Sequence, residues 1–412
     1  MDMSLKEFLA KNAKKSRILS NAWYTYRRYH NAVSMWKFRK QPVEQNTILF
    51  NNFYGRGFAC NPRVIAQVIH KEVPTAVLRW ICVTKEDADT LPDYIEPVYF
   101  GSNEYFKAMA TSSVWVFNEL LQDGIRKRKD QFYIQTYHGE RGFKKVGYDA
   151  VDNDSYRRKT GKRRIIEGDN CDLFLAGSQY AVKFIRSAFE YNGEILTEGT
   201  PRDDCLIYPD LKRRRKVREV LSVSDSTKVL LYAPTFRDST GVEGEIGSDI
   251  DLNGMLKALS DKSGEPWICL LRAHGGKTLQ AKKAYSEDNR FKDVTRYPDM
   301  ADLLLAADFL ITDYSSCSGD FALTGKPILL YQDDIDSYTN NDRSMYFKME
   351  DSPYWTAHNM EEAIRIITEM TDESAIENDR DILRFYETTE TGKAAEAVCQ
   401  RILAFWSGRS ER

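Results

Sequence analysis

Short apolar runs alternate with stretches of helical periodicity along most of the chain. Nine such runs span four to six residues each and are followed by polar or Gly-bearing residues. This is the pattern of buried strands, and strands that alternate with helices form parallel sheets. The chain is therefore predicted to be an α/β protein. The predicted strands are residues 47–51, 78–83, 113–117, 132–136, 172–176, 228–233, 267–272, 309–312 and 327–331.

The alternation is interrupted around residues 200–226, which hold two prolines and the basic run Lys212–Lys216. We interpret this stretch as a connection between domains that includes a charged helix. A chain of 412 residues is also longer than one core usually accommodates. We therefore expect two domains, residues 43–200 and 201–390, each built on a parallel sheet. The amphipathic stretch 391–412 is expected to form a helix that crosses back over the first domain.

The start of the chain differs from the rest in charge. Residues 1–40 hold ten Lys or Arg against two acidic residues, although the formal net charge of the chain is −2. Six aromatic residues lie between Trp23 and Phe38. Aromatic rings among basic residues suit an anionic membrane surface, where each Lys or Arg contributes about 1 kcal/mol. We expect residues 1–42 to form a basic amphipathic helical arm that associates with a membrane. The alternative is a helical hairpin packed on the body with a solvated basic face.

Other features of the composition restrict the class of protein. Seven cysteines occur without CxxC spacing, which argues against a disulfide framework and a structural zinc site. No apolar run approaches the ~20 residues that span a bilayer, and the first residues lack the layout of a secretory signal. We expect a cytoplasmic protein that lies peripherally at the inner face of the cell membrane.

Three internal basic runs raise the possibility of a non-catalytic nucleic-acid-binding protein. They are residues 126–129, 157–164 and 212–216. The chain as a whole is slightly acidic, however, and none of the common nucleic-acid-binding motifs occurs in it. We interpret the runs as solvated faces, or as surfaces that attract an anionic acceptor, and expect no nucleic-acid partner.

Parallel sheets bind ligands at the carboxyl ends of their strands, so the residues that follow the predicted strands are candidates for chemistry. His138 and Gly139 follow the run 132–136, with Lys144 and Lys145 a few residues further on. A neutral imidazole at this place could take a proton from an attacking hydroxyl. The alternative is a structural histidine at the end of a strand.

Two similar segments occur in the second half of the chain. Pro234, Thr235 and Arg237 follow the run 228–233, and an arginine there could grip a phosphate with two hydrogen bonds. His274 follows the run 267–272 and could donate a proton to a departing phosphate, or simply bind it. In both cases the alternative is an ordinary turn.

The fourth candidate segment follows the run 309–312. Asp313 ends the strand, and Ser315 and Ser316 open a predicted helix that contains Asp320. Free N–H groups at a helix start, the positive end of the helix dipole and serine hydroxyls together form a site for an anion. The alternative is an ordinary helix cap.

Together and in this order, the four segments resemble the CDP-glycerol glycerophosphotransferase family, the teichoic acid primases and polymerases of Gram-positive bacteria. The resemblance covers roughly residues 45–350. The matching segments are QTYHG at 135–139 with the two lysines after it, GTPRDD at 199–204, YAPTFRD at 232–238, RAH at 272–274 and TDYSSCSGDFALTGKPILLY at 312–331. The family usually continues the HG motif with Thr-Pro, where this chain has Glu140-Arg141-Gly142, and carries Pro at the place of Gly275.

The resemblance implies two Rossmann-like domains of GT-B type that face a cleft. The first domain would bind the acceptor and the second a CDP-alditol donor. His138 and His274 are the expected catalytic residues. The expected donor-binding residues are Pro234, Thr235, Arg237, Asp313, Ser315, Ser316 and Asp320. Those expected to bind the acceptor or a phosphate are Gly139, Lys144, Lys145 and Arg202. No carboxylate cluster has magnesium-ligand spacing, so we expect neither a metal nor another cofactor.

The predicted activity is the transfer of glycerol phosphate from CDP-glycerol to a hydroxyl of a lipid-linked acceptor, with release of CMP, in teichoic acid synthesis. One alternative is a transferase that uses CDP-ribitol or builds a capsule polymer. A second alternative is a GT-B glycosyltransferase that uses a sugar nucleotide.

Overall fold

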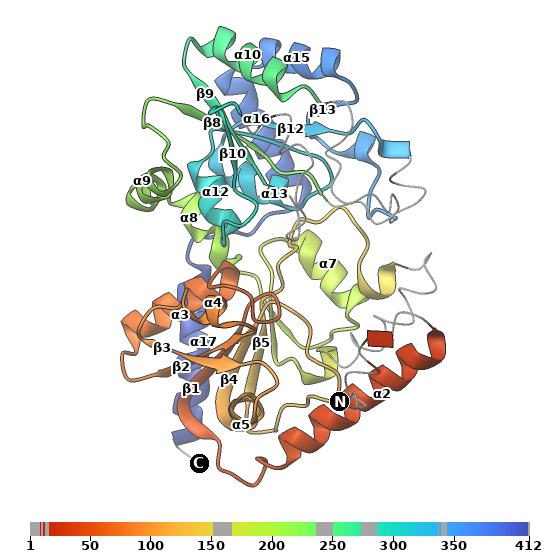
Figure 1. Ribbon diagram of the computed structural model, residues 1–412, viewed down its shortest axis with the longest axis vertical. Coiled ribbons are helices and arrows are strands. Elements are labelled where there is room, and N and C mark those ends of the chain that lie inside the picture. The colour runs from red at the N-terminus through yellow and green to blue at the C-terminus, as the bar shows by residue number, and fades with distance from the viewer. Residues whose placement is uncertain are drawn as a thin grey trace.

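The computed structural model describes residues 16–150, 167–235, 250–272, 287–336 and 344–410, together with the single positions 9, 11, 12, 285 and 338. Within these residues, two parallel sheets of seven and six strands lie in two domains, one above the other in Figure 1. The α/β class and the two successive parallel sheets predicted from the sequence are confirmed.

The sheet of the first domain has the strand order β3-β2-β1-β4-β5-β6-β7. Its strands are β1 (Glu44–Asn51), β2 (Val77–Cys82), β3 (Ile95–Tyr99), β4 (Ser112–Phe117), β5 (Phe132–Gln135), β6 (Leu173–Leu175) and β7 (Glu194–Leu196). The helices of this part of the chain are α2 (Arg17–Trp36), α3 (Cys60–Glu72), α4 (Lys85–Ala88), α5 (Asn103–Thr111), the 3₁₀ helix η1 (Gly147–Asp149) and α7 (Gln179–Ala188).

Both faces of this sheet are covered, which explains why the buried parts of its inner strands are mainly apolar on both faces. Ile48 and Phe50 of β1 pack in one core cluster with residues of α3 and of the last helix, α17 (Ala394–Ser410). Leu49 points to the other face and packs in a cluster with residues of α2, α5 and α7. Successive side chains of a strand point to opposite faces, so a strand buried on both faces has no polar alternation.

The sheet of the second domain has the order β10-β9-β8-β11-β12-β13. Its strands are β8 (Lys228–Tyr232), β9 (Trp267–Leu271), β10 (Phe291–Asp293), β11 (Phe309–Thr312), β12 (Ile328–Tyr331) and β13 (Thr356–Ala357). The helices that lead into this domain and surround its sheet are η2 (Pro201–Asp203), α8 (Asp204–Ile207), α9 (Leu211–Val220), α10 (Leu252–Ser263), α12 (Met300–Ala306), α13 (Cys317–Phe321), η3 (Ala322–Thr324), η4 (Met349–Asp351), α15 (Met360–Glu369) and α16 (Asp372–Phe385).

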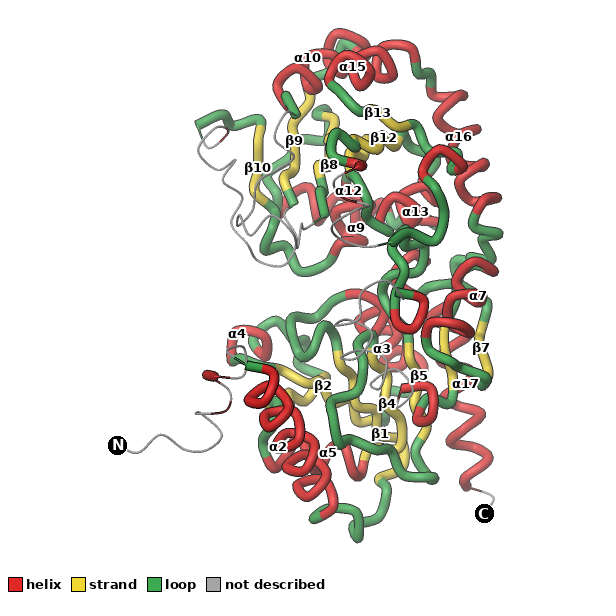
Figure 2. The backbone as a smooth tube through the Cα atoms, turned by 90° about the vertical axis from the view of Figure 1, so that its right-hand side faces the viewer, coloured by secondary structure: helices red, strands yellow, loops and turns green. Residues whose placement is uncertain are grey.

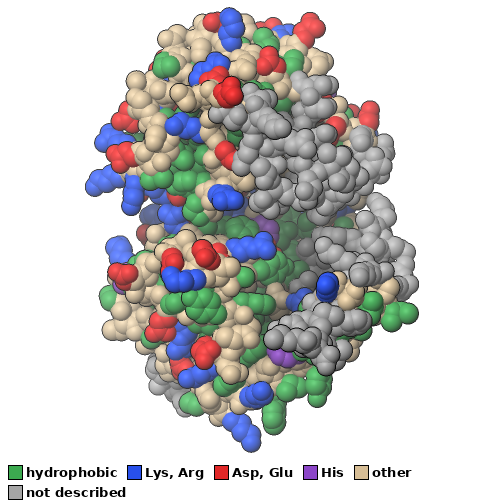
Figure 3. Space-filling model, viewed as in Figure 1, with side chains coloured by type: hydrophobic (Ala, Val, Ile, Leu, Met, Phe, Trp, Pro, Cys, Tyr) green, Lys and Arg blue, Asp and Glu red, His purple; other side chains and the backbone are tan. Residues whose placement is uncertain are grey.

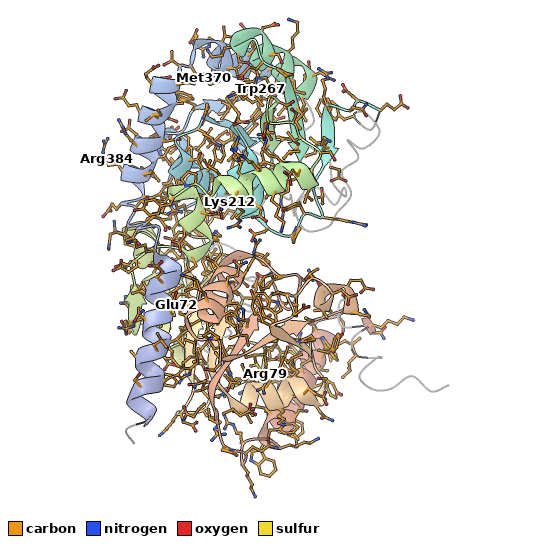
Figure 4. The ribbon with its side chains drawn as sticks, turned by 90° about the vertical axis from the view of Figure 1, so that its left-hand side faces the viewer. Glu72, Arg79, Lys212, Trp267, Met370 and Arg384 are labelled. Atoms are coloured by element: carbon orange, nitrogen blue, oxygen red, sulfur yellow. The ribbon has the colours of Figure 1, made fainter. Side chains whose placement is uncertain are left out.

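The end of the chain returns from the second domain to the first. The helices α16 and α17 follow each other along one side of the molecule, where the two domains join (Figures 2 and 4). In α17, Ile402 is fully buried against the first sheet, and the Trp406 indole donates a hydrogen bond of 3.0 Å to Ser113 Oγ of β4. The C-terminal helix therefore completes the core of the first domain.

Helix α2 carries the described part of the predicted arm. It begins after Ser16, whose hydroxyl accepts a hydrogen bond from Leu19 N, and Met35 near its end is buried in the core of the first domain. On its outer side, Ile18, Tyr29 and Trp36 are 80%, 73% and 65% exposed. The helix is thus packed on the body (Figure 1). It still presents these apolar side chains to solvent.

Two further expectations concern the described residues. All seven cysteines are free, and six of them are buried. None of the described helices is both long and apolar enough to cross a membrane.

Candidate active site

In each sheet the strand order reverses at one place, which we call the switch point. In the first domain it lies between β1 and β4, and in the second between β8 and β11. Chains leave neighbouring strands in opposite directions at such a place, so a crevice opens beyond the carboxyl ends of the strands. The molecular surface forms a depression between the two domains, and apolar side chains lie in this depression (Figure 3).

His138 lies at the switch point of the first domain, three residues after β5. Its side chain is 35% exposed, and its Nδ1 lies 2.8 Å from the carbonyl oxygen of Asn118, the residue that follows β4. The ring also packs against Phe53, which follows β1, and Tyr137. The imidazole is therefore held by groups from three neighbouring strand ends while part of it stays accessible.

The backbone around this imidazole is strained. Phe53 and Tyr137 have φ angles of 43° and 49°, in the left-handed region that residues with a side chain rarely adopt. Conformations of this kind persist where the surroundings hold them, and they concentrate at functional sites. Gly139 follows directly, and a Cβ atom there would lie 3.2 Å from the Tyr137 ring, so a side chain at this position would crowd the ring.

The segment after His138 leaves the first domain and packs on the second. Phe143 is fully buried in the core of the second domain, against the rings of Phe347 and Tyr354. Lys144 forms a backbone bridge with Met345, and its ammonium group lies 5.0 Å from the centre of the Tyr338 ring. Lys145 N donates a hydrogen bond of 2.9 Å to Ser344 O.

The two lysines predicted to bind the acceptor or a phosphate therefore lie in the segment after His138. This segment joins the domains, and we call it the strap. Both Lys144 and Lys145 remain partly exposed. The backbone contacts of this strap with residues 344–346 could not be predicted, because they join segments about 200 positions apart.

Arg141 of this strap is the centre of a buried ion cluster at the domain junction. Its guanidinium lies 3.2 Å from Asp203, 2.9 Å from Asp320 and 2.6 Å from Glu390, and its side chain is fully buried. A Cβ atom on Gly319 would approach Arg141 Cβ to 2.6 Å, so the glycine of α13 makes room for the arginine. The cluster ties the His138 loop to α13 and to the segment before α17.

Arg202 and Asp320, predicted to bind phosphate and donor, also belong to this cluster. Arg202 Nη2 lies 2.9 Å from Asp320 Oδ2, and Arg141 occupies the other carboxylate oxygen of Asp320. Both side chains are nearly inaccessible to solvent. The structure thus places these two residues in the ion cluster at the domain junction, where they hold α13 against the first domain.

Glu140 is buried beside this cluster and fixes the start of α7. Its Oε1 accepts hydrogen bonds of 2.8 Å from Gly177 N and from Ser178 Oγ. Burial raises the pKa of Glu140 to about 7, although the charge of Arg141 opposes this shift. Glu140 therefore fixes the start of α7, whereas Arg141 serves the junction between the domains.

At the switch point of the second domain, Asp313 holds the backbone of two strand ends. Its carboxylate is 4% exposed and accepts hydrogen bonds from Thr235 N at 2.9 and 3.0 Å and from Tyr314 N at 2.5 Å. These bonds join the Pro234-Thr235 turn after β8 to the segment after β11. Asp313 therefore fixes the shape of this turn, and its predicted role in donor binding stays a prediction.

Ser315 and Ser316 follow Asp313 and Tyr314 directly in the chain and are half-buried. Ser316 stands at the N-terminal boundary of the five-residue helix α13, which continues as the 3₁₀ helix η3, and its hydroxyl makes no capping bond. The predicted helix start after β11 is therefore present. Arg237 and His274 lie outside the described residues, so their placement stays a prediction.

A second ion cluster connects the domains near the start of α3. Asp299, before α12, accepts a hydrogen bond of 3.1 Å from Cys60 N and lies 3.0 Å from Arg63 Nη1. Asp302 contacts both Arg63 and Arg213 of α9. Part of the basic run Lys212–Lys216 is thus neutralised within the protein.

Residues 33–404 match the family described as CDP-glycerol:poly(glycerophosphate) glycerophosphotransferase. The chain is 30% identical over 338 residues to the teichoic acid poly(glycerol phosphate) polymerase of Bacillus subtilis (strain 168), which covers 81% of this chain and 45% of the polymerase. It is 28% identical over 386 residues to the teichoic acid glycerol-phosphate transferase of Staphylococcus aureus (strain NCTC 8325 / PS 47), with 90% and 97% of the two chains covered.

The fold is similar to that of a solved wall teichoic acid polymerase, TagF. The TM-score is 0.80 and the identity 25%, and the match covers 99% of each chain. The chain spans less than half the length of the curated polymerases from B. subtilis and Staphylococcus epidermidis that it matches. The family resemblance inferred from the motifs is confirmed by the match over most of the chain. This protein belongs to the CDP-glycerol:poly(glycerophosphate) glycerophosphotransferase family.

Proposed function

We propose that the protein transfers glycerol phosphate from CDP-glycerol to a hydroxyl of a lipid-linked acceptor in teichoic acid synthesis. The observation that carries this proposal is the position of His138. The chain belongs to this family, and its His138 imidazole lies at a switch point, is held through Nδ1 and is partly accessible. Such an imidazole can accept the proton of an attacking hydroxyl on its other nitrogen.

In the proposed reaction the acceptor oxygen attacks the β-phosphorus of the CDP-alditol. A new O–P bond forms, the P–O bond to CMP breaks, and the hydroxyl proton moves to His138 Nε2. Negative charge spreads over the transferring phosphoryl oxygens, so positioning and electrostatic stabilisation supply most of the catalysis. We assign this stabilisation to the N–H groups and hydroxyls at Ser315 and Ser316, with Arg237 and His274.

The proposed arrangement is of GT-B type, with the acceptor on the first domain and the donor on the second. Pro234 and Thr235 would shape the donor site, because the hydrogen bonds to Asp313 hold their turn in place. Gly139, Lys144 and Lys145 would face the acceptor or its phosphate. We propose that Arg202 and Asp320 act indirectly, by holding α13 in place.

We also propose that α2 brings the protein to the cytoplasmic face of an anionic membrane. The apolar side chains of Ile18, Tyr29 and Trp36 are exposed on this helix, and Arg28 and Lys37 are exposed close to them. Apolar insertion combined with basic charge is what retains a peripheral protein at anionic lipid. Liposome flotation tests this: wild type should float with anionic vesicles, and Trp36→Ser with Tyr29→Ser should weaken the binding.

The activity is tested by incubating the protein with CDP-glycerol or CDP-ribitol and a lipid-linked disaccharide analogue. CMP release together with a product heavier by one or more alditol phosphates is the expected result. A chelator should leave the rate unchanged, since we propose that no metal or other cofactor is needed. Release of UDP or GDP from a sugar nucleotide, without CMP release from either alditol donor, would contradict the proposal.

A further inference from the structure

We propose that the backbone carbonyl of Asn118 and the carboxylate of Glu119 are a positioning pair for His138. The carbonyl selects the ring nitrogen that carries the proton, and the carboxylate stabilises the ring when it becomes positively charged. This inference rests on the proposed function and adds two residues to the acceptor side of the same site.

The carbonyl determines the tautomer of the imidazole. A carbonyl oxygen only accepts hydrogen bonds, so the 2.8 Å contact between Asn118 O and His138 Nδ1 requires the proton on Nδ1. In the neutral ring, Nε2 then carries a lone pair. This is the protonation state that a general base needs before the acceptor hydroxyl arrives.

The carboxylate of Glu119 lies beside the same edge of the ring. Its Oε1 is 3.8 Å from His138 Nδ1, and its side chain is 16% exposed. When Nε2 takes the proton of the hydroxyl, the ring becomes an imidazolium, and a negative charge at this distance stabilises it. The stabilisation is stronger in the transition state than in the ground state, so it acts on kcat. After the transfer the proton leaves Nε2 for solvent, and the ring is neutral again.

The Asn118 side chain anchors its own peptide unit to the two residues that follow the neighbouring strand β1. Asn118 Nδ2 donates a hydrogen bond of 2.8 Å to Asn52 Oδ1, and Asn118 Oδ1 accepts one of 2.9 Å from Phe53 N. The side chain of Asn118 is fully buried. These bonds hold the peptide unit whose carbonyl faces His138.

Gln135, the last residue of β5, ties this pair to the His138 loop. Its Nε2 donates to Glu119 O at 3.2 Å, and its Oε1 accepts a hydrogen bond of 2.9 Å from Tyr137 N. Gln135 is fully buried. One amide therefore sets the spacing between the backbone of Glu119 and the backbone next to His138.

The first test replaces the carboxylate by an amide of the same shape. In Glu119→Gln, kcat for CMP release in the presence of acceptor should fall about 10- to 100-fold, a part of the 10²–10⁴ that a general base supplies. The KM for CDP-glycerol should stay within about twofold. Glu119→Asp, which keeps the charge, should recover part of the lost kcat, and Glu86→Gln on the exposed surface of α4 should match wild type.

A kcat of Glu119→Gln within twofold of wild type, while wild type releases CMP, would overturn the role of Glu119 and leave the proposed function intact. A fall in kcat accompanied by a lower thermal midpoint, with no recovery in Glu119→Asp, would also overturn it, because the effect would then be on folding.

The second test reads the tautomer and does not depend on turnover. The ¹⁵N spectrum of histidine-labelled protein, with the His138 signals assigned by their loss in His138→Asn, should show the proton on Nδ1. Observation of the Nε2–H tautomer would overturn the role of the Asn118 carbonyl. If wild type turns over neither alditol donor, the proposed function fails, and this spectrum still decides whether the carbonyl sets the proton.

Discussion

The switch points of the two domains are built in opposite ways. In the first domain a backbone carbonyl binds the partly exposed His138 side chain, whereas in the second the buried Asp313 side chain binds backbone N–H groups. His138 is 35% exposed and is held by Asn118 O. Asp313 is 4% exposed, and its carboxylate receives N–H groups from both strand ends. The first site therefore presents the His138 imidazole to solvent. The second presents a turn of defined shape beside serine hydroxyls.

The two sites are joined through the strap after His138. Arg141 reaches from the first domain to Asp320 on α13, only a few residues from Ser315 and Ser316. The two sites are therefore linked through a buried ion cluster.

The largest effect is expected at the first site. His138→Asn should lower kcat by about 10²–10⁴, the usual contribution of a general base. The free energy of unfolding should change by less than about 1 kcal/mol, because the ring is partly exposed. Steady-state kinetics and urea unfolding measure the two quantities. His70→Asn, in the last turn of α3 beside Tyr94 at the amino end of β3, is the matched control.

The next effect is expected at the junction. Arg141→Met should lower the free energy of unfolding by about 3–5 kcal/mol, since it removes the cation from buried Glu390 and leaves Asp203 and Asp320 to share Arg202. Urea unfolding measures this change. Arg384→Met, which removes an exposed ion pair on α16, should change the free energy by less than about 1 kcal/mol. An equal effect of the two substitutions would show that the buried cluster does not hold the domains together.

A pH-dependent effect is expected at Glu140. Its pKa is about 7 in the folded protein against a reference value of 4.5, so the folded state binds the proton more tightly than the unfolded state. The stabilisation is complete below pH 4.5 and is lost as the pH rises through 7. Compared with Glu140→Gln, wild type should lose on the order of 3 kcal/mol between pH 4.5 and pH 8. Parallel stability curves for the two proteins would contradict the assignment.

The smallest effect is expected at the second site. Asp313→Asn keeps the shape of the side chain but removes the charge that accepts the N–H groups of Thr235 and Tyr314. The free energy of unfolding should fall by about 1–3 kcal/mol. The KM for CDP-glycerol should rise more than kcat falls. The exposed residue Glu361 of α15 provides the control Glu361→Gln. A dominant loss of kcat would instead place the Asp313 carboxylate in the chemical step.

The strands show what hydrophobic patterning can predict. The nine predicted strands all lie inside the two sheets, whereas the four that were missed, β3, β7, β10 and β13, are the edge strands. Interior strands of a covered parallel sheet are apolar on both faces. Edge strands are short or partly solvated: β3 contains Glu96 and Pro97, and β13 has two residues. Their positions depend on the neighbour they pair with, which the local sequence does not specify.

The site was predictable to the extent that it lies at strand ends. His138, Asp313, Ser315 and Ser316 follow predicted strands, and the structure places them at the two switch points. Asn118 and Glu119 follow a predicted strand as well, and the same rule applied there would have found them. The partners of Arg141 could not be inferred, because its contact with Glu390 joins residues 249 positions apart.

The central claim is that an acceptor hydroxyl attacks the β-phosphorus of the donor, with the His138 imidazole as the base. It is tested most directly with CDP-glycerol that is radiolabelled at the phosphate bonded to glycerol, incubated with the lipid-linked acceptor. The account predicts that the label moves to the lipid product and that CMP is unlabelled, at a rate at least about 100-fold lower in His138→Asn. Label retained in the nucleotide product, or equal transfer by the two proteins, would contradict it.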